Sequence, residues 1–431
     1  MYFKSTRNGK DRVKYKISDA MLKGLANDGG LLVPSTFPLI NWKNLDNDIT
    51  FKDFTKIFLQ PFFKGDILEK SINDICNDCF NFSLPVHHLD NNFSVLELFH
   101  GPTLSFKDFG ARFLASCIER IPKDKIMTIL VATSGDTGSA VASAFFNRKN
   151  IRVVILFPEN KITQRQQDQM TCWGENILTI AVKGNFDDCQ RLVKLSFSDA
   201  WWAKNTMLNT SNSINIGRIL PQATYYAYSS FIHYQYRHET SNFIVPSGNI
   251  GNITSAYWSK ICGFPIDSII AAQNANNTIS SYVESDIYPN SDTIETVANA
   301  MDVGKPSNFE RLVDLFDNRD RFKENVKAIS VDDENIIKQI YSTYRKFDYI
   351  ICPHTATAFF AHEKINRESL KNWIMIATAD PSKFEKIISR SINIDLEPCN
   401  RLKELLSRKK HFFSIDPTMN DLKALYKQFF L

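Results

Sequence analysis

The chain has 431 residues, which at roughly 150 residues per domain predicts two or three domains. Lys and Arg (51) nearly balance Asp and Glu (47), so the formal net charge of +4 excludes a strongly basic nucleic-acid-binding protein. Hydrophobic residues make up 43% and charged residues 23%, as in ordinary water-soluble proteins, and no apolar run is long enough to predict a membrane span.

The start of the chain and its cysteines indicate where the protein works. Residues 1–16 carry charges where a signal peptide has its apolar stretch. The eight cysteines lack the spacing of a disulfide framework, so we expect reduced thiols and a cytoplasmic protein. Cys76 and Cys79 form a lone C-x-x-C in a helical pattern, which favours packing over zinc binding, and no metal is expected.

The hydrophobic pattern changes along the chain. Residues 1–85 combine a Gly-Gly turn at Gly29 with a long helical pattern over residues 54–80, which predicts a cap subdomain. From residue 126, short apolar runs alternate with amphipathic stretches. The predicted strands are 126–133, 152–158 and 176–182, and the predicted helices are 139–149, 162–174 and 186–199.

A second series of strands follows a long predicted helix over residues 218–238. These strands are expected at 242–246, 267–273, 348–354 and 373–380. Alternating strands and helices predict parallel sheets covered on both faces, so the fold class is α/β. Two such layers in one chain imply a cleft between them, with the ligand at the carboxyl ends of the strands.

Two glycine-rich loops lie between a predicted strand and a predicted helix, at residues 132–140 (ATSGDTGSA) and 245–252 (VPSGNIGN). Glycines allow close backbone approach, and a helix N-terminus offers free N–H groups to an anion. One such loop alone is more often a plain connection, but two indicate two anionic groups bound in one cleft. Neither has the pattern of a nucleoside triphosphatase or a dinucleotide enzyme, and Asp136 in the first favours a carboxylate over a polyphosphate there.

Lys107 lies among aromatic residues in the sequence LFHGPTLSFKDFGARF. The segment alone fits a surface lysine that extends along apolar neighbours. A partly desolvated lysine instead has a lowered pKa and can form a Schiff base with an aldehyde. A cleft with two anion-binding loops favours the second interpretation, because pyridoxal phosphate and an amino-acid substrate need one loop for a phosphate and one for a carboxylate.

Several segments resemble the threonine synthase family of bacterial and fungal type, in the family's order over nearly the whole chain. They are GLANDGGLLVP, ELFHGPTLSFKDFGARF, ATSGDTGSA, FPENKITQRQQDQM, KGNFDDCQRLVK, NTSNSINIGRILPQATYY, FIVPSGNIGN and MDVGKPSNFERL. The resemblance implies the tryptophan-synthase-β-like fold (PLP fold type II): two open parallel-sheet α/β domains flanking a cofactor cleft, with an N-terminal cap subdomain. It also implies pyridoxal 5'-phosphate as cofactor and conversion of O-phospho-L-homoserine and water to L-threonine and phosphate, a lyase reaction of threonine biosynthesis.

The resemblance also implies roles for individual residues. Lys107 matches the cofactor lysine and acid/base, and Thr378 matches the residue that faces the pyridine nitrogen. The cofactor-binding loop is Ser247, Gly248, Asn249, Ile250, Gly251 and Asn252. The loop for the substrate carboxylate is Thr133, Ser134, Gly135, Asp136, Thr137 and Gly138. The expected domains are 1–85 for the cap, 86–108 with 240–431 for the larger α/β domain, and 109–239 for the smaller.

A substrate phosphate in a closed cleft must be paired with cationic or donor groups. The candidates are Lys161, Asn215, Arg218 and Arg112. Lys161 and Arg112 equally fit a solvated helix end or a structural ion pair, and Asn215 equally fits a helix cap.

Near the expected cofactor edge, two residues depart from the family pattern and one histidine has two possible roles. The chain has Cys352 and Asp380 where the family commonly has aspartate and histidine, which leaves the ring contacts open. His354 fits a structural, hydrogen-bonded histidine better than a ligand-orienting one.

Two other functions remain open: a related phospho-lyase that releases a keto acid, and a non-catalytic cofactor or amino-acid sensor on the same fold. We expect a small-molecule substrate, no nucleic acid, no membrane partner and, by analogy with related bacterial proteins, a monomer.

Overall fold

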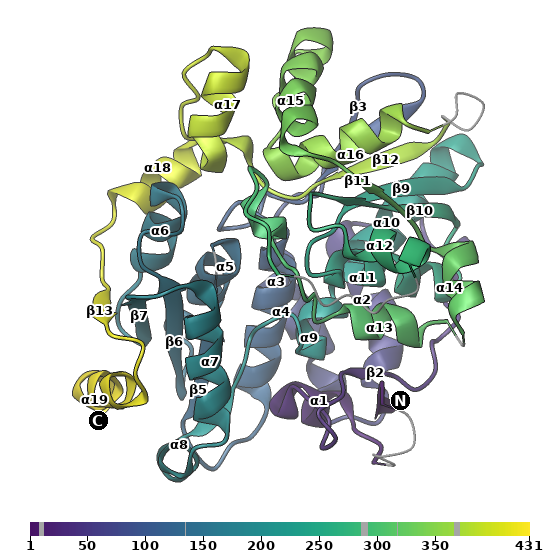
Figure 1. Cartoon of the computed structure of the whole chain (residues 1–431). Coiled ribbons are helices and arrows are strands. Elements are labelled where there is room, and N and C mark those ends of the chain that lie inside the picture. The colour runs from purple at the N-terminus through teal and green to yellow at the C-terminus, as the bar shows by residue number, and fades with distance from the viewer. Residues whose placement is uncertain (8–12, 134, 286–291, 317, 366–370) are drawn as a thin grey trace.

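The computed structural model describes residues 1–7, 13–133, 135–285, 292–316, 318–365 and 371–431. Its described strands form two large sheets and one short antiparallel pair, β1 (Phe3–Ser5) with β2 (Leu32–Pro34). The large sheets lie on opposite sides of the molecule, with helices packed around each (Figure 1). This is the expected α/β architecture of two mainly parallel sheets with an N-terminal subdomain.

The five-stranded sheet has the order β13-β7-β6-β5-β8, and all its pairs are parallel. Its strands are β5 (Met127–Ala132), β6 (Ile151–Pro158), β7 (Ile177–Val182), β8 (Met207–Asn209) and β13 (Phe413–Ile415). Strands β5, β6 and β7 confirm the first predicted series. Strand β13 comes from the end of the chain, which the expected division assigned to the other domain, and α19 packs beside it (Figure 1).

The six-stranded sheet has the order β11-β10-β9-β12-β4-β3, in which only β3 is antiparallel to its neighbour. Its strands are β3 (Val86–His88), β4 (Phe93–Glu97), β9 (Ser241–Pro246), β10 (Ile266–Gln273), β11 (Lys327–Ser330) and β12 (Trp373–Ala377). The predicted strands at 242–246, 267–273 and 373–380 are confirmed within a few residues.

The predicted strand at residues 348–354 is wrong. Asp348 ends helix α15 in the left-handed conformation, and Pro353 begins helix α16. Only residues 349–352 remain between the two helices, and they pair with no described strand. Ile351 and Cys352 are buried in this connection, and Tyr349 and Ile350 are half-buried. Proline at a helix start explains the boundary, because its missing N–H would have no partner there in any case.

The α-helices surround the two sheets. They are α1 (Ile17–Lys23), α2 (Phe51–Phe63), α3 (Ile72–Cys79), α4 (Lys107–Arg120), α5 (Asp136–Phe145), α6 (Gln164–Thr171), α7 (Phe186–Phe197), α8 (Ala200–Asn205), α9 (Ile216–Ile219), α10 (Gln222–Arg237), α11 (Gly251–Ile261), α12 (Thr278–Ser285), α13 (Phe309–Asp314), α14 (Arg319–Asn325), α15 (Asp333–Phe347), α16 (Pro353–Glu363), α17 (Glu385–Ile392), α18 (Asn400–Ser407) and α19 (Met419–Phe430). Short 3-10 helices are η1 (Trp42–Asn44), η2 (Glu69–Ser71), η3 (Asn299–Met301) and η5 (Pro381–Phe384). The predicted helix over 218–238 is two helices, because Pro221 separates α9 from α10.

Aromatic packing joins the N-terminal subdomain to the part of the chain that forms the six-stranded sheet. Helix α2 buries Phe54 and Phe58 against Phe231 of α10 and Phe264 before β10, with ring centroids 5.5 to 5.8 Å apart. Aromatic pairs at this separation add to the stabilisation from burial.

No helix among the described residues is long and apolar enough to span a bilayer. The eight cysteines are free thiols.

We expect Phe58→Ala to lower the free energy of unfolding by about 3–5 kcal/mol, because it leaves a cavity at this junction. Ile57→Ala on the same helix is the matched control, since Ile57 is 39% exposed, and should change it by less than about 1 kcal/mol. Denaturant unfolding of both variants checks this. Equal losses in the two variants would contradict the packing described here.

Candidate active site

One cavity of about 810 Å³ opens where the carboxyl ends of both sheets meet. Its lining includes Thr133 after β5, Ser247 after β9, Thr378 after β12, and Lys107 at the start of α4. The ends of parallel strands converge there with the starts of the following helices, whose N–H groups favour anions. The cavity thus lies in the predicted place, between the two sheets.

Lys107 is the first residue of α4 and lines the cavity. Burial lowers the pKa of Lys107 to about 8, although the nearby Asp136 carboxylate acts in the opposite direction. Its Nζ lies 4.0 Å from Asp136 Oδ2 and 4.7 Å from the centre of the Phe106 ring. A lysine of this kind is partly neutral near physiological pH and can act as a nucleophile or base.

The loop of residues 247–252 lines the cavity and begins helix α11. Within the described residues, the backbone N–H groups of residues 248–252 donate no hydrogen bond to the protein. A Cβ at Gly248 would meet Met301 Cα at 2.5 Å, so only glycine fits this close approach. Ile250 has the left-handed φ of 63° that turns the chain into the helix. The loop therefore presents free amides to an anion.

Two side chains of this loop make internal contacts. Asn249 donates to Ser213 Oγ at 2.5 Å and accepts from the Ser307 amide at 2.7 Å. Asn252 Oδ1 accepts from the hydroxyls of Tyr225 and Tyr226 at 2.6 and 2.7 Å. These bonds hold the loop in place, so the ligand-binding groups are mainly the backbone amides.

The loop of residues 133–138 contributes Thr133, Asp136 and Thr137 to the cavity wall. Gly135 and Gly138 lie outside that wall: their N–H groups donate to Thr133 Oγ1 at 3.1 and 3.0 Å, which closes the turn. Ser134, also predicted to bind substrate, lies outside the described residues.

Among the candidates for phosphate binding, only Arg218 lines the cavity. Its side chain is buried and Nη1 donates to Ser211 O, but within the described residues Nε has no partner and no carboxylate forms an ion pair with it. Burial lowers the pKa of Arg218 to about 10, so it stays charged at physiological pH. The Asp108 carboxylate offsets part of the cost of burying this charge, but without an ion pair the cost stays high unless a ligand brings a negative charge to the guanidinium.

The structure does not bring the other three candidates to the cavity. Lys161 is exposed after β6. Arg112 donates to the carbonyl oxygens of Cys79 and Asp78, because it lies on the face of α4 that packs against α3. Asn215 caps α9 through Gly217 N and donates to Met21 O, so its amide is used in the protein. Asn215 thus acts as the helix cap that the sequence also allowed, whereas Arg112 bonds to carbonyl oxygens and not to a carboxylate.

The two departures from the family pattern also have structural roles. Asp380 caps η5 by accepting from Ser382 N at 2.8 Å. Cys352 Sγ lies 3.2 Å from Thr355 Oγ1 and 3.8 Å from His354 Nδ1. His354 lines the cavity, and its Nε2 accepts from Ala300 N at 3.0 Å. Burial lowers the pKa of His354 to about 4, which keeps it neutral.

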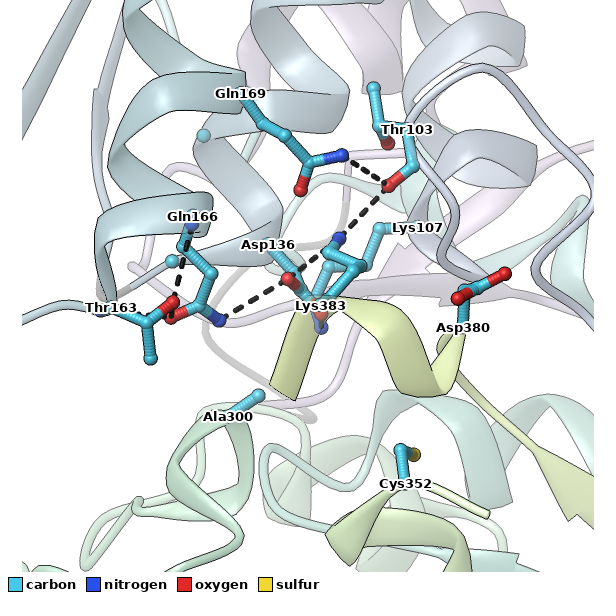
Figure 2. Close-up of polar contacts among 12 residues, drawn as sticks. Thr103, Lys107, Asp136, Thr163, Gln166, Gln169, Ala300, Cys352, Asp380 and Lys383 are labelled. Atoms are coloured by element: carbon cyan, nitrogen blue, oxygen red, sulfur yellow. Dashed lines mark hydrogen bonds and ion pairs between the residues drawn. The ribbon is translucent and has the colours of Figure 1, made fainter. Parts of the chain in front are cut away.

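Sequence reasoning missed several residues of the site. Asn212, Ser213, Lys23 and Lys305 line the cavity. Lys383 lies behind it, fully buried, with Nζ 2.8 Å from Asp136 Oδ1 (Figure 2). Its sequence signal was its place shortly after Thr378, in the same segment as Asp380, where the family also commonly has lysine.

Comparison with known proteins decides the family. The pattern of "Pyridoxal-phosphate dependent enzyme" matches residues 82–378, and that of "Threonine synthase N terminus" matches residues 2–80. Threonine synthase of Buchnera aphidicola from Schizaphis graminum is 37% identical over 97% of both chains. The chain belongs to the threonine synthase family.

Solved structures agree with this assignment. Pyridoxal-phosphate-bound threonine synthase from Brucella melitensis superposes with a TM-score of 0.91 at 30% identity and covers 99% of both chains. Threonine synthase from yeast gives a TM-score of 0.91 at 29% identity, covering 99% of this chain and 98% of that one. The fold is therefore that of the threonine synthases, and the chain is a pyridoxal-phosphate-dependent lyase of that family.

The residues of the cavity fit this cofactor. Free amides in the 247–252 loop can hold a phosphate, and Lys107 offers an amine of lowered pKa to the aldehyde. Thr378 places a neutral hydroxyl group in the same cavity. A cavity of about 810 Å³ is also large enough for the cofactor and a small substrate together.

We expect this threonine synthase, stripped of cofactor, to capture pyridoxal phosphate about tenfold faster at pH 9 than at pH 7, because the neutral amine reacts. The rate should level off above about pH 8, the pKa of Lys107. Stopped-flow absorbance measures it, with a free lysine derivative as the reference amine. A rate that keeps rising in parallel with the free amine to pH 10 would contradict the lowered pKa.

Proposed function

We propose that this enzyme converts O-phospho-L-homoserine and water to L-threonine and phosphate in the cavity described above. The observation that carries the proposal is the buried Arg218 guanidinium in the cavity that holds Lys107: among the described residues its Nε has no hydrogen-bond partner, and the Asp108 carboxylate acts on it without forming an ion pair. A substrate with a phosphate group supplies the missing negative charge.

The cofactor-binding part of the proposal concerns the six-stranded sheet. The amides of the 247–252 loop would hold the cofactor phosphate, Lys107 would supply the amine for the covalent link, and Thr378 would supply a hydroxyl group to the ring nitrogen. When bound, the cofactor supplies an electron sink next to the substrate α carbon. A neutral hydroxyl at Thr378 leaves that nitrogen less protonated than a carboxylate would.

The substrate is bound by other segments of the cavity wall. Thr137 and the start of α5 receive the substrate α-carboxylate, because the N–H groups of Asp136 and Thr137 donate to no described residue. Arg218 binds the substrate phosphate, with the hydroxyl of Ser213 in the same wall. These two contacts fix the substrate at both ends and place its α carbon near Lys107.

Proton transfer is assigned to Lys107. With a pKa of about 8, its amine can take a proton from the α carbon and return it at the β or γ carbon. His354, with its lowered pKa and Nε2 bonded to a backbone amide, is held neutral and serves to shape the wall.

The proposal also covers the location, the partners, the oligomeric state and the domain division of the enzyme. The free cysteines support a cytoplasmic location. The near-neutral net charge supports the absence of nucleic-acid partners. We propose a monomer, and a division into residues 1–85, residues 86–108 with 240–431, and residues 109–239, with strand β13 crossing to the sheet of the third part.

Purified enzyme incubated with O-phospho-L-homoserine should release threonine and phosphate in equal amounts, and Lys107→Ala should lose both the activity and the absorbance of the lysine-linked cofactor. Amino-acid analysis and a phosphate assay measure the products. Phosphate with 2-oxobutanoate would indicate a phospho-lyase instead, and no turnover by cofactor-loaded enzyme would indicate a sensor. Full activity of Lys107→Ala would contradict the mechanism.

Arg218→Met should lower kcat/KM by about 10- to 150-fold, because a charged hydrogen bond to the substrate phosphate contributes about 1.5–3 kcal/mol. Lys161→Met is the matched control, since Lys161 is exposed outside the cavity wall. Steady-state kinetics compares the two. A loss in Lys161→Met with none in Arg218→Met would place the phosphate elsewhere.

A further inference from the structure

A carboxylate occupies the loop proposed for the substrate carboxylate. Asp136 begins helix α5, is 3% exposed and lines the cavity. Burial would raise the pKa of Asp136, but the ammonium groups of Lys383 and Lys107 outweigh this effect and hold its pKa well below the usual range. The side chain is therefore ionised, and unless compensated it would repel a second carboxylate at the same loop.

Lys383 supplies this compensation from behind the cavity wall. Its Nζ lies 2.8 Å from Asp136 Oδ1 and donates to Thr103 O at 2.9 Å (Figure 2). The side chain is 0% exposed and lies outside the cavity lining. Lys383 can therefore affect the reaction only through other residues.

Lys383 also joins the two halves of the site. It lies on η5, which follows β12 of the six-stranded sheet, whereas Asp136 follows β5 of the five-stranded sheet. Arg165 of α6 reinforces the junction: it donates to Ser382 O and pairs with Glu385 at 3.3 Å. Gln166 of the same helix donates to Asp136 Oδ1 at 3.3 Å (Figure 2). Several polar contacts therefore fix the geometry of the pair.

We propose that Lys383 is a positioning residue of the reaction: it neutralises Asp136, so that the 133–138 loop accepts the substrate carboxylate beside Lys107, and it ties that loop to η5. The inference rests on the proposed role of the loop. Breaking a buried ion pair by removing one partner leaves an uncompensated charge, whereas removing both charges does not. This asymmetry separates an electrostatic role from simple packing.

Lys383 also acts on Lys107 through the shared carboxylate. The charged and titratable groups that face Lys107 are Asp136 of α5, Arg218 of α9, Lys383 of η5, and Cys352 and His354 at the start of α16. Without Lys383, Asp136 is free to pair with Lys107, which favours the protonated amine. Without Asp136, both remaining neighbouring cations favour the neutral amine.

The test compares Lys383→Met, Asp136→Asn and the double variant with the unchanged enzyme, and uses Lys386→Met, at an exposed position of the adjoining helix α17, as control. We expect Lys383→Met to raise KM for O-phospho-L-homoserine about tenfold or more, with a smaller change in kcat. The double variant should return KM to within about threefold of the unchanged enzyme, since both charges are gone. Lys386→Met should change neither parameter.

A second readout is the pH midpoint of cofactor capture by the stripped full-length chains. It should move up in Lys383→Met and down in Asp136→Asn. If Lys383→Met does not fold, Asp136→Asn still decides, because an upward shift or a tenfold rise in KM in that variant would overturn the proposal. A double variant as impaired as Lys383→Met would also overturn the proposal. An unchanged enzyme that forms no threonine would overturn the proposed function instead, whereas normal kinetics of Lys383→Met would overturn only this inference.

Discussion

The site depends on placing several charges in one buried cavity and compensating each of them. Lys107 is driven toward the neutral amine by burial, while the Asp136 carboxylate remains ionised because Lys383 lies against it. Arg218 keeps its charge although it forms no ion pair with a described carboxylate and its Nε has no hydrogen-bond partner there. Isolated charges in such surroundings are expensive, so each one indicates a partner within the protein or in a ligand. For Asp136 the partner is Lys383, and for Arg218 we propose the substrate.

The fold makes this arrangement possible. Both large sheets direct the carboxyl ends of parallel strands to the same cavity, and the helices that follow begin there with free amide groups. Anions are therefore held by loops and helix ends with few basic side chains. This explains how a chain with a net charge of only +4 can bind three small anionic groups: the cofactor phosphate, the substrate carboxylate and the substrate phosphate. The cofactor chemistry needs no basic surface.

The features that could be predicted from sequence are the local ones. Lys107, Thr378 and the two glycine-rich loops lie in contiguous motifs at strand ends, and the structure gathers them in one cavity. The direction of an isolated side chain depends on distant segments. The sequence allows Arg112 to bind the substrate phosphate, but the structure packs it against α3. Nothing in the sequence near Lys383 indicates its contact with Asp136. The predicted strand at 348–354 was wrong for a local reason, a proline that starts a helix.

The central claim is that the cofactor phosphate, the substrate carboxylate and the substrate phosphate bind at three separate anion sites around Lys107. A crystal structure of the cofactor-loaded enzyme with a non-hydrolysable phosphonate analogue of the substrate tests it most directly. The account predicts the cofactor phosphate on the amides of the 247–252 loop, the analogue's carboxylate at the start of α5 and its phosphonate within hydrogen-bond distance of Arg218. A phosphonate bound away from Arg218, with the guanidinium still unpaired, would contradict the account.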